Sequence, residues 1–139
     1  MYLLDTNIVS ELRRERPHGA VVAWINAVAD HELFLSVVTL AEIQAGIELT
    51  REQNPQRAEA LEIWLNLVAE TYHILVMDAV IFRLWAKLMH KNSNTLYEDA
   101  MIAATAKAHN LTVVTRNVND FKHFNVTIFN PFNYKDNLR

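Results

Sequence analysis

The sequence predicts an α/β fold in which helices cover both faces of a mainly parallel sheet. Short apolar runs of strand length alternate along the chain with longer segments of helical periodicity. Of the 139 residues, 51% are hydrophobic, which is enough to build one core. Repeats, low-complexity tracts and flexible linkers are missing from the sequence. We therefore expect a single domain over residues 1–139.

Five apolar runs are expected to form the strands, because they are short and mostly β-branched or aromatic. They cover residues 2–4, 33–36, 73–77, 111–115 and 126–129. Six periodic segments between them are expected to form helices, and Asn54 and Asp78 stand where N-caps belong. These segments cover residues 8–16, 20–29, 40–50, 55–70, 79–91 and 98–110.

Composition excludes several kinds of chemistry. The chain has no cysteine, which excludes disulfides, zinc–cysteine sites, iron–sulfur clusters and thiol nucleophiles. Its two glycines are too few for a glycine-rich phosphate loop. A net charge of −3 argues against binding nucleic acid by bulk charge, and leaves local patches or bound cations to attract phosphate. Catalysis must come from oxygen or imidazole groups.

The N-terminus shows no targeting signal, since an apolar strand-like run follows Met1 directly. The apolar runs are also far shorter than the roughly 20 residues of a spanning helix. We expect a cytoplasmic protein without a membrane partner.

Acidic side chains recur where a parallel sheet places its ligand site, at the carboxyl ends of the strands. Asp5 ends the first strand, and Glu42 opens the helix after the second. Asp99 opens the helix before the fourth strand, which Asn117 and Asp120 follow. Converging carboxylates repel one another, and a hard divalent cation relieves that repulsion. The pattern predicts a Mg²⁺ or Mn²⁺ site.

Structural interpretations of the same acids remain open. Thr39 with Glu42, and Thr95 with Glu98, both fit the capping box that opens helices. Asp99 also suits the first turn of a helix.

Two further acids have comparable alternatives. Asp5 could cap the first helix, although an ionisable group at the end of an apolar strand needs a partner, which favours a functional role. Asp120 alone is typical of a turn.

Other hydrolytic sites find little support. An aspartyl-phosphate mechanism needs a second Asp two positions after Asp5, and Asn7 stands there. The six histidines form no zinc-binding pair, and the serines lack a nucleophile elbow.

Four segments resemble PIN-domain ribonucleases, most strongly the VapC toxins and among them the FitB-like group. They are LLDTN at 3–7, SVVTLAEIQAG at 36–46, EDAMIAATAKAHNLTVVTRN at 98–117 and NDF at 119–121. The resemblance covers nearly the full length. It implies a single PIN domain, a three-layer α/β/α sandwich that cuts RNA endonucleolytically with Mg²⁺, for which Mn²⁺ is a possible substitute.

The resemblance also assigns site residues. Asp5, Glu42 and Asp99 match the family's main metal-site acids, and either Asn117 or Asp120 completes the site. We expect Asp120 to act with the catalytic acids and Asn117 with the metal ligands. Polar motif positions suited to orienting ligands or substrate are Thr6, Asn7, Thr39, Thr115 and Arg116.

The family further implies a homodimer and a small VapB-like or FitA-like antitoxin, through which the complex contacts operator DNA. Residues 79–91 are apolar almost all round, which fits either an interface or a helix buried on two sides. Residues 55–70 fit either an antitoxin groove or core packing. Arg13, Arg14 and Arg16 either guide RNA or form a solvated face. The alternative function is a non-catalytic PIN-like binding module.

Overall fold

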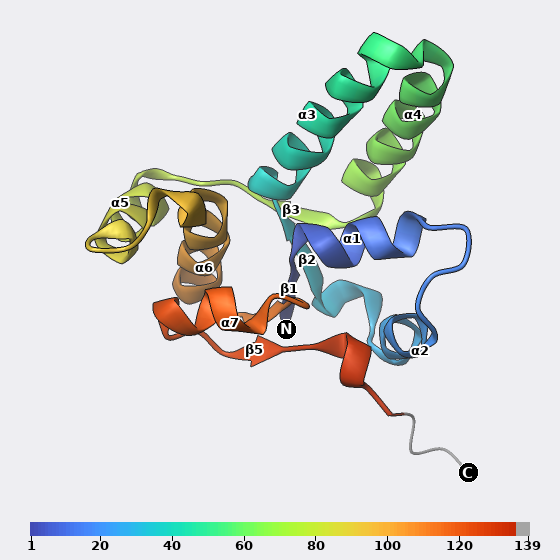
Figure 1. Ribbon diagram of the computed structural model, residues 1–139. Helices are drawn as coiled ribbons and strands as arrows, with labels where there is room; N and C mark the ends of the chain where they lie inside the picture. Colours follow the sequence, from blue (N-terminus) through green and yellow to red (C-terminus); the bar gives the residue numbers. More distant parts are fainter. Residues whose placement is uncertain (136–139) are drawn as a thin grey trace.

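All five strands pair in parallel in one sheet, in a computed structural model that describes residues 1–135 (Figure 1). The strand order is β3-β2-β1-β4-β5, so β1 is central. Leu4 at the end of β1 lies beside Leu35 of β2 and Val114 of β4. The strands are β1 (Tyr2–Leu4), β2 (Leu33–Ser36), β3 (His73–Leu75), β4 (Thr112–Val114) and β5 (Ile128–Phe129). The predicted parallel sheet is confirmed.

Helices fill the connections, as predicted, with shifted ends. The six long ones are α1 (Thr6–Arg13), α2 (Gly19–Ala27), α3 (Val37–Gln53), α4 (Pro55–Thr71), α5 (Ala79–Met89) and α6 (Tyr97–His109). A four-residue helix, α7 (Val118–Phe121), was not predicted. The largest difference is at α3, which begins at Val37 because the Ser36 hydroxyl accepts a hydrogen bond from the Val38 N–H at 3.0 Å. Short 3₁₀ turns include one at Pro131–Asn133.

Alternate residues of each strand point to opposite faces of the sheet, and each face is covered by helices. On one face, Leu3 and Val113 belong to a buried cluster with Ile102 of α6 and Phe121 of α7. On the other, Leu4, Leu35 and Val114 belong to a cluster with Val21 and Trp24 of α2. This arrangement confirms the α/β/α sandwich.

The α3–α4 hairpin extends away from the sheet (Figure 1). Its own small core contains Ile47, Ala58 and Leu65. Asn54 caps α4 and Asp78 caps α5, through hydrogen bonds from the N–H groups of Arg57 and Ile81. No helix within residues 1–135 is long and apolar enough to cross a membrane.

Glu11 stabilises the connection between α1 and α2. Its carboxylate is only 6% exposed and accepts the backbone N–H of His18 at 2.9 Å. Glu11→Ala would leave that N–H without its partner, so we expect the free energy of unfolding to fall by about 1–3 kcal/mol. Glu11→Gln should recover part of the loss, because an amide oxygen still accepts. Urea denaturation of the two variants tests this, and equal losses would contradict it.

Candidate metal centre

Asp5 lies at the carboxyl end of the central strand and is only 4% exposed. Its Oδ1 accepts the backbone N–H of Thr6 at 2.8 Å, which caps α1. Its Oδ2 accepts the hydroxyl of Thr115 at 2.8 Å and the side-chain amide of Asn7 at 3.2 Å. Asp5 therefore both caps a helix and holds a fixed carboxylate, so its capping and functional interpretations are compatible. We call the edge of the sheet at which it lies with Glu42, Glu98, Asp99 and Asp120 the rim.

Thr115 joins the end of β4 to the end of β1. Its buried hydroxyl donates to Asp5 and accepts the backbone N–H of Asn117 at 2.9 Å. The Asn7 carboxamide bridges the same two segments, because its oxygen accepts the N–H of Arg116 at 3.3 Å. These contacts hold the Asp5 carboxylate in one orientation.

Glu42 faces Asp5 from α3. The Thr6 hydroxyl lies 3.0 Å from Glu42 Oε1 and 3.0 Å from the Thr39 hydroxyl. Because α3 begins at Val37, Thr39 and Glu42 lie inside the helix and form no capping box. The capping interpretation of Glu42 is wrong. Its carboxylate is instead available to bind a ligand together with the other acids of the rim.

Asp99, the third residue of α6, has the most strongly raised pKa among the acids of the rim. Burial, followed by the charges of Asp5, Asp120, Glu42 and Glu98, raises the pKa of Asp99 to about 7. Acids that are distant in the sequence therefore lie within electrostatic reach of one another.

The capping interpretation of Glu98, which the sequence left open, is wrong as well. Leu96 is the N-cap of α6 and makes no side-chain capping bond, while the Thr95 hydroxyl pairs with Ser93 at 2.9 Å. The Glu98 charge instead raises the pKa of Glu42 and of Asp99. In the sequence, this electrostatic role of Glu98 is indicated by its position directly before Asp99.

Among the described residues, the rim carboxylates have no basic side chain paired with them. Burial is also the main cause that raises the pKa of Asp5 and of Glu42, and it outweighs their hydrogen bonds. The ion pairs within residues 1–135 join Arg14 to Glu11, and Arg51 to Glu48 and Glu62, so none involves a rim acid. Uncompensated like charges of this kind favour binding of a cation.

The donor chemistry of the rim fits a hard divalent cation, since its ligands are carboxylate, hydroxyl and carboxamide oxygens. Within the described part of the chain, no group of three or more histidine, cysteine, aspartate or glutamate side chains is arranged so that it could hold a metal ion. Mg²⁺ does not require such a group, because it keeps several waters and takes one or two carboxylates together with substrate phosphates.

Asn117 and Asp120 lie on the β5 side of the rim. Asn117 is the N-cap of α7, and its side chain makes no capping bond. Both residues line a polar pocket of about 390 Å³ with Arg116. The Arg116 guanidinium lies 4.4 Å from the centre of the Phe132 ring, which holds it at the pocket.

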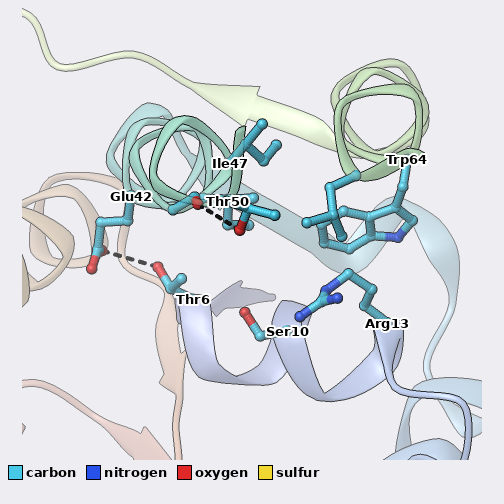
Figure 2. A pocket seen from close by; sticks show the side chains of 10 residues that line it. Thr6, Ser10, Arg13, Glu42, Ile47, Thr50 and Trp64 are labelled. Carbon is cyan, nitrogen blue, oxygen red and sulfur yellow. Dashed lines mark hydrogen bonds between the residues drawn. The ribbon is translucent and has the colours of Figure 1, made fainter. Parts of the chain in front are cut away.

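A groove leads away from Glu42 between α1, α3 and α4 (Figure 2). It has a volume of about 330 Å³. Thr6 and Glu42 lie at one end, and Arg13 and Trp64 lie at the other. The rim is thus continuous with this groove, because Thr6 and Glu42 belong to both.

Comparison with known proteins finds relatives that match this chain over nearly its full length. The PIN domain family matches residues 2–126. The chain is 34% identical to Toxin FitB of Neisseria gonorrhoeae, over 95% of this chain and 99% of the relative. It is 36% identical to a VapC ribonuclease of Sinorhizobium fredii, over 95% of this chain and 98% of the relative.

Two solved structures also resemble this protein over nearly its full length. The crystal structure of FitAcB from Neisseria gonorrhoeae superposes with a TM-score of 0.85 at 33% identity, covering 96% of this chain and 99% of that chain. A structure of FitAB bound to a DNA fragment superposes with a TM-score of 0.84 at 30% identity, covering 99% of this chain and all of that chain.

Proposed function

Because this chain belongs to the PIN-domain family, we propose that it is a metal-dependent endoribonuclease and the toxin of a type II toxin–antitoxin pair. The observation that carries the proposal is the convergence of acids on Asp99. Burial and the charges of Asp5, Asp120, Glu42 and Glu98 raise its pKa to about 7, and none of these acids forms an ion pair within residues 1–135. The likeness to a VapC ribonuclease supports RNA as the substrate, and the likeness to Toxin FitB supports the role of a toxin.

Asp5, Glu42 and Asp99 would hold the cation, with Asp120 or Asn117 contributing through water. When bound, Mg²⁺, or Mn²⁺ in its place, supplies charge neutralisation and a coordinated water of lowered pKa. The side chains of the protein would orient the carboxylates and bind the substrate.

Several neighbours orient this carboxylate set. Thr115 and Asn7 fix Asp5 by donating to its Oδ2, and the Thr6 hydroxyl lies within hydrogen-bonding distance of both Glu42 and Thr39. Arg116, held on Phe132, presents a guanidinium that can bind a substrate phosphate.

Mapping of RNA 5′ ends shortly after induction in a bacterial host tests the proposal. Hydrolysis by water, rather than attack by the RNA 2′-hydroxyl, would leave a 5′-phosphate and a 3′-hydroxyl, so we expect sharp new monophosphorylated ends with the wild type. Cyclic phosphate ends would contradict this route. No new ends would favour the alternative, a non-catalytic PIN-like binding module.

Thr115→Val tests whether the orientation of Asp5 matters. Valine fills the same space but cannot donate to the carboxylate, so we expect cleavage to fall by about 10- to 100-fold. Thr115→Ser keeps the hydroxyl and should retain most activity. Cleavage of total bacterial RNA by the purified variants measures both rates, and equal activity of the two would show that the hydrogen bond is dispensable.

The proposal includes an antitoxin partner, with operator DNA contacted only through the toxin–antitoxin complex. A solved relative, FitAB, is a complex bound to DNA, which supports this arrangement. It also includes a homodimer. Val80 and Phe82 of α5 are 69% and 46% exposed, and Val76 before that helix is exposed too, so this apolar face is available to a second copy.

A further inference from the structure

A basic pocket adjoins the far end of the groove that starts at Glu42. Its volume is about 530 Å³, and its charged lining consists of Arg13, Arg14 and Arg57 with a single acid, Glu15. Arg13, Leu61 and Trp64 line both this pocket and the groove. The two depressions therefore form one track that runs from the acids of the rim to three arginines, which we name the α1–α4 track.

The guanidinium groups of this track are available to a ligand. Arg13 and Arg57 are exposed and make no ion pair within residues 1–135, while Arg14 pairs with Glu11 at 3.4 Å. Arg13 Cζ lies 5.7 Å from the centre of the Trp64 ring. In Figure 2 the Arg13 side chain extends from α1 to a position below Trp64 of α4. A cation and an aromatic face are thus presented side by side.

We propose that the α1–α4 track binds the single-stranded RNA substrate beside its scissile phosphate, an inference that rests on the proposed ribonuclease function. Arg13 and Arg57 bind backbone phosphates, and a base stacks against Trp64. Proteins that bind single strands combine a positive groove with aromatic faces in this way. The net charge of the whole chain is −3, so a local basic track is needed to bring a polyanion to an acidic rim.

The geometry fixes the order of contacts along the strand. Arg13 stands seven residues after Thr6 on α1, a distance of about 10 Å along the helix. The arginines therefore contact phosphates next to the one that is cut, and they stay away from the reacting atoms. An anion recognised by charge alone needs no Trp64, whereas a polynucleotide supplies both phosphates and bases.

Binding of a fluorescently labelled single-stranded RNA of mixed sequence tests the track, measured by anisotropy over a series of salt concentrations. All variants carry Asp99→Asn so that the probe stays intact. Arg13→Gln and Arg57→Gln should each weaken low-salt affinity about five- to tenfold and reduce the slope of log affinity against log salt by about 0.7. Arg83→Gln, which removes an exposed charge from α5, is the matched control and should leave the slope unchanged.

The same arginine substitutions in the otherwise wild-type protein should raise KM for RNA cleavage, with the loss seen in KM rather than in kcat. If they match Arg83→Gln in affinity, slope and KM while the wild type cuts RNA, the track assignment is wrong and the ribonuclease proposal survives. If they cut RNA normally but resist inhibition by the antitoxin, the track binds protein and the assignment is again wrong. If the wild type neither binds nor cuts RNA, both proposals fail.

Discussion

Asp99→Asn is expected to abolish RNA cleavage while leaving the fold intact. The substitution keeps the size of the side chain and removes one charge from the proposed metal-binding set. The carboxylate supplies a ligand whose loss weakens transition-state charge stabilisation, so we expect the rate to fall at least about a hundredfold. Cleavage assays with the purified protein measure this, and a rate equal to that of the wild type would remove Asp99 from the site.

Glu98→Gln is the matched control for that experiment. It neutralises the neighbouring carboxylate in the same first turn of α6, where the exposed Glu98 acts on Asp99 only through its charge. We expect its cleavage rate to fall less than about tenfold. If both variants lost activity equally, the total charge of the rim would matter more than the Asp99 ligand.

The same substitution should change how stability depends on pH. The pKa of Asp99 rises from 3.8 to about 7 on folding, because burial and neighbouring acids disfavour its charged form. The folded state then binds more protons than the unfolded state between these values, so stability falls as pH rises through this window. Since Asp99 is half-buried, solvent screens part of the effect, and we expect about 1–2 kcal/mol.

Urea denaturation in metal-free buffer measures that effect. Asp99→Asn should be more stable than the wild type at pH 8 and nearly equal to it at pH 4, because the wild-type carboxyl is then largely protonated. A constant difference between the two proteins across this range would contradict the assigned pKa.

Much of the fold could be predicted because hydrophobic burial dictates the sequence pattern. Strands buried on both faces read as short apolar runs, and the segments between them have helical periodicity. The start of α3 could not be predicted well. Val37 and Val38 are β-branched residues that suit a strand, whereas in the structure the Ser36 side chain caps the helix that they open.

The acids of the rim were predictable for a topological reason, since parallel strands bring their carboxyl ends to one edge. The α1–α4 track was not. Arg13 stands in a basic cluster of the sequence, whereas Arg57 lies far from it in the sequence and on a different helix. Periodicity places Trp64 on a face of its helix without saying that α1 lies opposite. Contacts between distant helices depend on three-dimensional packing that local pattern does not encode.

Removal of divalent cations is expected to abolish cleavage completely, and addition of Mg²⁺ should stabilise the fold in a pH-dependent way. Ligand binding to the folded state stabilises it by about 2.7 kcal/mol when the ligand is at 100 times its Kd. Protons compete with the cation for carboxylates, and the pKa of Asp99 of about 7 places that competition near neutrality. Mg²⁺ should therefore raise Tm at pH 8 and much less at pH 5.

Thermal unfolding with Mg²⁺ and with EDTA at both pH values, beside cleavage assays in the same buffers, separates the possible results. In Asp99→Asn the Tm increase at pH 8 should shrink, because one charged ligand is missing. Cleavage that survives EDTA would rule out a metal-dependent reaction. A Tm increase of equal size at pH 5 and pH 8 would place the cation away from these acids, because carboxyl groups that are protonated in the folded state bind Mg²⁺ only by releasing their protons.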